Sequence, residues 1–174
     1  MATHIFTEQQ KFRQLWLWIL VLFSGMMPVA IFGVGLYIQL FKGQPFGNNP
    51  MSDNGLITAF ALTLLLVFAL FALFAFSTLK VRIDKYAIKV RFVPFIIKER
   101  TTKWTEVASW EVVKYNAIRE YGGWGLRANR KGKAYNVSGN MGLRLQLRNG
   151  KELLIGTSQS EALKAFLAQL KPLG

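Results

Sequence analysis

An uncharged run of 25 residues, from Gly55 to Leu79, constrains the folding of this chain more than any other feature. The run reads GLITAFALTLLLVFALFALFAFSTL. A helix needs about 20 apolar residues to cross a hydrocarbon core of about 30 Å. The sequence therefore predicts a transmembrane helix over residues 55–79.

A second uncharged run, from Gln14 to Phe41, precedes the first. It is longer than the apolar region of a secretory signal peptide, which covers about 7–15 residues, and it predicts a second span over residues 14–41. Neighbouring helices re-satisfy the carbonyl that a proline frees, so we expect Pro28 to kink this helix rather than end it. Small residues let membrane helices approach closely. Those of this run are Gly25, Gly33 and Gly35.

The distribution of positive charge predicts the orientation of the two spans. Of the 22 Lys and Arg residues, 2 precede the first span, 1 lies between the spans and 19 follow the second. Cytoplasmic segments carry the excess of Lys and Arg in membrane proteins. We therefore expect both termini in the cytoplasm, an outside turn at residues 42–54, and a separate cytoplasmic domain at residues 80–174.

The cytoplasmic part alternates between apolar and polar residues, which is typical of strands with one buried face. Asn149-Gly150 lies between two such segments and is a strong hairpin signal. We expect seven or eight strands in a meander, all antiparallel. Residues 158–171 then predict one amphipathic helix, with Ser158 as its N-cap, Glu161 completing a capping box, and Lys171 and Pro172 at its end. Its apolar stripe is Leu163, Phe166, Leu167 and Leu170.

A run of strands covered by one C-terminal helix is the element order of the pleckstrin-homology (PH) fold. The segments GWGLR, AYNVSG and LRNGKELLIGTSQSEAL resemble those of a family of small bacterial inner-membrane proteins that have two N-terminal helices and a PH-like domain. The resemblance implies a transmembrane hairpin followed by an antiparallel PH-like β-barrel or sandwich of about seven strands. PH-like folds bind lipids, bind peptides or act as scaffolds, so the fold leaves the function open.

The residue inventory disfavours catalysis. Cysteine is absent and the single histidine is His4, so neither a Ser-His-Asp set nor a zinc site of His and Cys ligands can be assembled. The glycines around Trp124 match neither a dinucleotide fingerprint nor a phosphate loop. We expect no catalytic, cofactor-binding or metal-binding residues, and we expect Trp124 and Leu126 to face the core.

The remaining functional signal is charge. Residues 80–174 contain 19 basic and 7 acidic residues, a net charge of 19 − 7 = +12. The cytoplasmic leaflet attracts basic residues that lie within a Debye length of about 8 Å. We expect weak, non-specific contact with anionic lipid through a turn at residues 129–132 and through residues close after the second span. The candidates are Arg127, Arg130, Lys131 and Lys133, and then Lys80, Arg82 and Lys85.

Two other interpretations of these features stay open. A basic hairpin tip is often only a solvated tip, and a basic cytoplasmic domain also follows from topology. The chain could instead be an accessory subunit of a larger membrane complex that packs against a membrane-protein partner through its helices. No nucleic-acid partner is expected, because no RNA-binding aromatic signature is present.

Overall fold

The computed structural model describes residues 5–170 and divides the chain into two compact units. The helical unit covers Arg13–Ala75. The β unit combines the residues through Phe12 with those from Phe76 onward. The β unit therefore draws on both sides of the helical unit, whereas the sequence predicted a domain that begins only after the second helix.

The helical unit consists of two helices that pack against each other. Helix α1 (Leu15–Leu36) continues as a π-helix, η1 (Tyr37–Phe41), and α2 covers Asp53–Phe76. The rings of Trp18 and Phe71 pack edge to face at 5.1 Å. A Cβ atom on Gly25 would lie 2.8 Å from Val67 Cγ1, so this glycine permits the close approach that the sequence predicted. Gly35 instead faces the ring of Phe46, in the connection between the helices.

Both helices are long and apolar enough to span a membrane, and few of their residues are buried. Helix α1 continues through Pro28 without a break, as predicted. The connection between the helices is held by Gln39, whose Nε2 donates to the Met51 carbonyl at 2.8 Å and to Asp53 Oδ1 at 2.7 Å.

The first sheet of the β unit, sheet A, has the strand order β1-β2-β3-β4 within residues 5–170, and all its pairs are antiparallel. The sequence missed its first strand, which precedes α1. The inward side chains of that strand are Phe6, Glu8 and Gln10, so it lacks the apolar alternation that marks the other strands. The strands are β1 (Phe6–Lys11), β2 (Thr78–Ile83), β3 (Ala87–Val93) and β4 (Ile96–Lys103).

Sheet B follows, with the strand order β5-β8-β9-β7-β6 in the described part of the chain. The hairpin predicted at Asn149-Gly150 joins β8 and β9. The expectation of an all-antiparallel meander is wrong, because β7 and β9 pair in parallel. The strands are β5 (Val107–Lys114), β6 (Gly125–Ala128), β7 (Gly132–Asn136), β8 (Met141–Leu147) and β9 (Glu152–Gly156), with the short helices η2 (Trp104–Glu106) and α3 (Ala117–Tyr121) beside β5.

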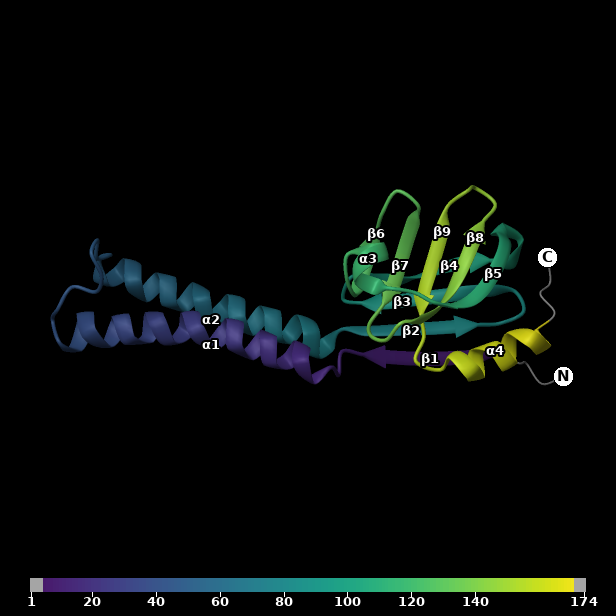
Figure 1. Ribbon diagram of the computed structural model, residues 1–174. Coiled ribbons are helices and arrows are strands. Elements are labelled where there is room, and N and C mark those ends of the chain that lie inside the picture. Colours follow the sequence, from purple (N-terminus) through teal and green to yellow (C-terminus); the bar gives the residue numbers. More distant parts are fainter. Residues whose placement is uncertain (1–4, 171–174) are drawn as a thin grey trace. The chain divides into compact units, whose positions relative to one another are not determined.

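The parallel pair depends on a close approach at Gly132. A Cβ atom at this position would collide with the carbonyl oxygen of Glu152, so any larger residue would push β7 away from β9. The two sheets stay separate and do not close into a barrel, which was one of the two predicted arrangements. In Figure 1 the strands of sheet B run steeply across those of sheet A.

The core lies between the two sheets and helix α4 (Ser160–Gln169). Leu163 and Leu167 of the predicted stripe are buried, and the Phe166 ring lies 5.8 Å from that of Phe6 on β1. The predicted cap is wrong, because α4 begins after Gln159 and Ser158 bonds to Glu8 instead. Lys171 and Pro172 lie outside the described residues. The fully buried strand side chains include Leu79, Ile83, Ile88, Phe92, Leu143, Leu145 and Leu154.

Candidate functional site

The outward surface of sheet A carries four basic side chains on two neighbouring strands. Strand β2 alternates between buried apolar residues and outward cations, and β3 does the same. This alternation follows from the two-residue repeat of a strand, which sends successive side chains to opposite faces. We call the group the four-cation face, and it consists of Lys80, Arg82, Lys89 and Arg91.

The register of β2 and β3 places these like charges directly opposite one another. Lys80 pairs with Arg91 across the strands, and Arg82 pairs with Lys89. Side chains in such positions have Cβ atoms about 4.5–5.5 Å apart, and like charges there destabilise a sheet. The arrangement costs stability, so its explanation must lie outside the packing of the fold.

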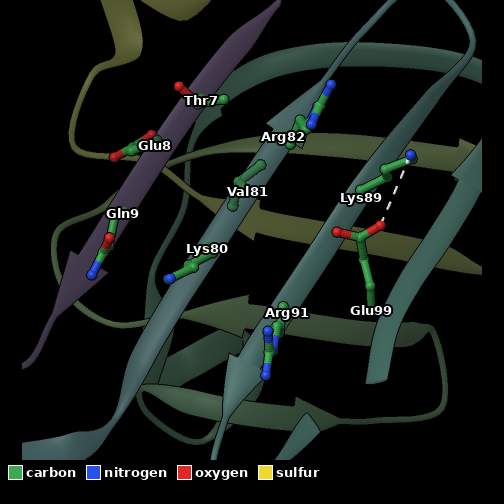
Figure 2. Close-up of a pocket in the computed structure, with 9 residues that line it drawn as sticks. All are labelled: Thr7, Glu8, Gln9, Lys80, Val81, Arg82, Lys89, Arg91 and Glu99. Carbon is green, nitrogen blue, oxygen red and sulfur yellow. Dashed lines mark ion pairs between the residues drawn. The ribbon is translucent and has the colours of Figure 1, made fainter. Parts of the chain in front are cut away.

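Acidic side chains neutralise this face only in part. Lys89 Nζ lies 3.9 Å from Glu99 Oε1, and both side chains are solvent-accessible, so this ion pair contributes little. Glu8 lies on the next strand but turns inward. Its carboxylate accepts hydrogen bonds from Thr157 Oγ1 at 2.6 Å and from Ser158 N and Oγ, each at 2.7 Å. Figure 2 shows the Glu8 side chain extending away from the cations.

A shallow groove of about 380 Å³ runs over the four-cation face. The outward side chains of β1, Thr7 and Gln9, form its other wall, next to Arg82 and Lys80 respectively. Two guanidinium groups and two ammonium groups provide many hydrogen-bond donors and no acceptor. The groove therefore suits oxygen-rich anions such as phosphate esters, which guanidinium groups can bind in a bidentate manner.

The structure brings two of the predicted contact residues, Lys80 and Arg82, together in this groove, but places Lys85 elsewhere. Lys85 lies in the turn between β2 and β3, at the opposite end of β2 from its connection to α2. Its Nζ lies 4.9 Å from the centre of the Tyr86 ring.

The predicted hairpin cations form a second group, on sheet B. All four are exposed, with Arg127 on β6, Lys133 on β7, and Arg130 and Lys131 in the turn between these strands. Asn129 closes the turn by accepting hydrogen bonds from the backbone N–H groups of residues 131 and 132, each at 2.9 Å. Arg127 Nε donates to the Trp124 carbonyl at 3.0 Å.

The segment before this turn corrects one core prediction. Trp124 is half-buried and packs against a core cluster that includes Tyr115 and Tyr121. Leu126 was expected to face the core but is exposed, because Gly125 has a positive φ of 108° and its N–H is held by the buried Asn136 Oδ1 at 2.8 Å.

Lys89 and Arg91 were not among the predicted contact residues, although the sequence contains a signal for them. The turn between Ile83 and Ile88 fixes which residues of β2 and β3 face each other. Counting outward from that turn pairs position 82 with 89 and position 80 with 91. The register alone could therefore have identified the four-cation face.

A contrasting charge cluster on sheet B surrounds Arg144. Its Nη2 lies 2.7 Å from Glu120 Oε2, its Nε lies 3.5 Å from Glu152 Oε1, and its Nη1 lies 3.9 Å from Glu111 Oε1. The Tyr121 hydroxyl donates a short hydrogen bond to Glu152. Burial, reinforced by this bond, raises the pKa of Tyr121 above its ordinary value of 10.0. In this cluster the Arg144 cation is balanced by neighbouring carboxylates.

Comparisons with protein-family models, with curated proteins and with solved structures find no match to the chain. The function is therefore argued from the residues themselves.

Proposed function

We propose that the chain is a non-enzymatic, membrane-anchored protein whose four-cation face binds anionic phospholipid headgroups. The observation that carries the proposal is the pair of like-charge contacts, Lys80 with Arg91 and Arg82 with Lys89, on an exposed surface. An anionic ligand would relieve the repulsion within both pairs, which gives a physical reason for an arrangement that costs stability.

The chain connections favour lipid as the source of the anion. Strand β2 begins two residues after the last residue of α2, Phe76, and β1 ends four residues before the first residue of α1, Leu15. An extended chain covers at most about 3.6 Å per residue, so Lys80 lies within about 14 Å of the end of α2. If the helices span the membrane, this part of the face stays near the headgroups.

The proposal includes an orientation and a setting. Both termini lie in the cytoplasm of a bacterial cell, and the two helices cross the inner membrane. The excess of Lys and Arg after the second helix supports the orientation, and anionic lipids in the facing leaflet supply the attraction. The bacterial setting rests on the resemblance described above.

We also propose that the β unit is a variant of the PH-like fold. Two crossed sheets and a C-terminal helix support this assignment (Figure 1). The parallel pairing of β7 with β9 is a departure from an antiparallel meander. The assignment does not carry the lipid proposal, which depends on the four-cation face and on its connection to the two helices.

Native mass spectrometry of the full chain, released from vesicles of phosphatidylcholine and phosphatidylglycerol, tests the proposal. The wild-type chain should retain phosphatidylglycerol in preference to phosphatidylcholine. The double variant Lys80→Gln with Arg91→Gln should lose most of this preference. The charge-matched control, Arg130→Gln with Lys133→Gln, removes two cations from sheet B and should keep it.

Two results would contradict the proposal. A wild-type chain that retains both lipids equally would show that no anionic site exists. A preference that survives in the sheet A variant but disappears in the control would place the site on the hairpin between β6 and β7.

A further inference from the structure

The turn between β3 and β4 exposes apolar side chains at its tip. The Phe95 ring packs edge to face against the buried Phe92 ring, with centres 5.3 Å apart, yet Phe95 remains 47% exposed. Ile97, at the start of β4, is 68% exposed. Isolated exposed apolar residues are common on protein surfaces, so exposure alone does not indicate a binding surface. The position of the tip in the fold is the further evidence.

The strand register fixes that position. Val93, the last residue of β3, lies opposite Thr78, the first residue of β2. The turn after Val93 therefore continues past Thr78, on the side where the chain arrives from α2. Phe76, the last residue of α2, is 73% exposed and precedes Thr78 by two residues, a separation of at most about 7 Å. The tip and Phe76 thus share one end of sheet A.

Basic residues flank the apolar tip. Arg91 lies two residues before Val93, and Lys98 follows Ile97 directly. Both cations are exposed. Some segments bury apolar side chains at the boundary between headgroups and acyl chains and hold basic residues at headgroup level. Such segments bind anionic membranes through both apolar burial and electrostatic attraction. The charge around the tip thus favours a lipid surface as its occupant.

We propose that Phe95 and Ile97 insert into the interface of the bilayer that α1 and α2 cross. The inserted tip forms a third attachment of the β unit, beside its two connections to the helices. It holds Lys80 and Arg91, the cross-strand pair nearer this end of the sheet, at headgroup level. The inference rests on the proposed membrane anchoring but not on headgroup binding by the four-cation face.

The absence of cysteine makes a site-directed spin-label test direct, because each variant then carries a single thiol. Full-length Phe95→Cys and Ile97→Cys are labelled with a nitroxide in phosphatidylcholine–phosphatidylglycerol nanodiscs. Accessibility to oxygen, which concentrates in lipid, is compared with accessibility to a water-soluble nickel chelate. Phe23→Cys on α1 is the lipid reference, and Arg130→Cys in the turn between β6 and β7 is the aqueous reference.

We expect labels at positions 95 and 97 to favour oxygen over nickel, as at position 23. A label at 95 that is aqueous, as at 130, would overturn the inference while the label at 23 still supports membrane anchoring. A label at 23 that is aqueous would overturn the anchoring itself. A label at 95 shielded from both reagents would identify a protein surface as the occupant and would also overturn the inference.

A second measurement keeps an aromatic ring at the tip, because a label at position 95 removes Phe95. Full-length Phe95→Trp and Arg130→Trp are compared in nanodiscs that contain brominated phospholipid. The fluorescence added by Phe95→Trp should be quenched, whereas that added by Arg130→Trp should not. Equal quenching of the two would contradict insertion of the tip.

Discussion

The two sheets of the β unit treat their charges in opposite ways. Sheet B gathers the carboxylates of Glu111, Glu120 and Glu152 around Arg144. Sheet A turns the carboxylate of Glu8 into the interior and leaves four cations outside, opposed only by Glu99 among the residues that line the groove. The charges around Arg144 are therefore paired, whereas the four-cation face that we propose for lipid is neutralised only in part. Variants that break the charge pairs of sheet B or relieve the like-charge contacts of sheet A can test whether the two sheets differ in this way.

The largest effect is expected at Glu8, which is only 5% exposed and accepts three hydrogen bonds from Thr157 and Ser158. Glu8→Ala removes these bonds and leaves the buried Thr157 hydroxyl without this acceptor, which should lower the free energy of unfolding by about 3 kcal/mol. Urea unfolding of the full chain in detergent, followed by near-ultraviolet circular dichroism, measures the loss. Thr7→Ala changes the neighbouring outward residue and should be nearly neutral. A small loss for Glu8→Ala would mean that β1 is held by its strand pairing alone.

A smaller loss, of about 2 kcal/mol, is expected from Arg144→Leu, because three carboxylates then face one another without a cation. Arg144 is 26% exposed in its side chain, so water offsets part of the repulsion. The same unfolding measurement applies. Arg91→Leu is the matched control on sheet A, and it should cost no stability because it relieves a like-charge contact. Equal losses in the two variants would remove the contrast between the sheets.

Three buried tyrosines of the β unit also predict alkaline sensitivity. Burial raises the pKa of Tyr121, Tyr115 and Tyr135 in the folded chain above 10.0. The unfolded chain then loses these protons first, so the stability they contribute is complete below pH 10 and is lost as the pH rises through the folded pKa values. Tyr121→Phe should cost about 1 kcal/mol at neutral pH, through the lost bond to Glu152, and should flatten the decline above pH 10. Urea unfolding at a series of pH values measures this decline. If the unfolding free energies of the variant and the wild type fell in parallel above pH 10, Tyr121 would not contribute to the alkaline loss.

Local patterns in the sequence predicted much of this fold. The two long apolar helices, the strands of the alternating segments and the turn at Asn149-Gly150 follow from uncharged length, two-residue periodicity and turn chemistry, although α2 ends at Phe76 rather than at the predicted Leu79 and α3 was missed. The register of β2 and β3 was also accessible, since the turn between Ile83 and Ile88 determines it. Features that depend on neighbours within a few residues were therefore within reach.

Features that depend on distant partners were not predictable in this way. Glu8 bonds to Ser158, 150 positions away, and this contact explains both the missed strand β1 and the misplaced cap of α4. A buried carboxylate in a strand has the same sequence signature as an exposed one. The parallel pairing of β7 with β9 likewise depends on the close approach at Gly132, which looks like an ordinary turn glycine in the sequence.

The smallest effect on stability, and the one that most directly separates stability from function, is expected from Lys80→Glu. This change converts the like-charge contact with Arg91 into a contact between opposite charges on an exposed surface. Such pairs contribute a few tenths of a kcal/mol, so the unfolding free energy should rise slightly. Retention of phosphatidylglycerol in native mass spectra should fall at the same time.

Lys133→Glu is the matched control for that change. It alters the charge by the same amount, but Lys133 faces Ala128 and Leu153 across its strand rather than another cation. We therefore expect neither a gain in stability nor a loss of lipid. A variant that becomes more stable while losing its ligand would mean that the cations on β2 and β3 are retained for binding and at the expense of the fold. A Lys80→Glu chain that gains stability and keeps its lipid preference would instead show that the four-cation face is only solvated and does not bind lipid.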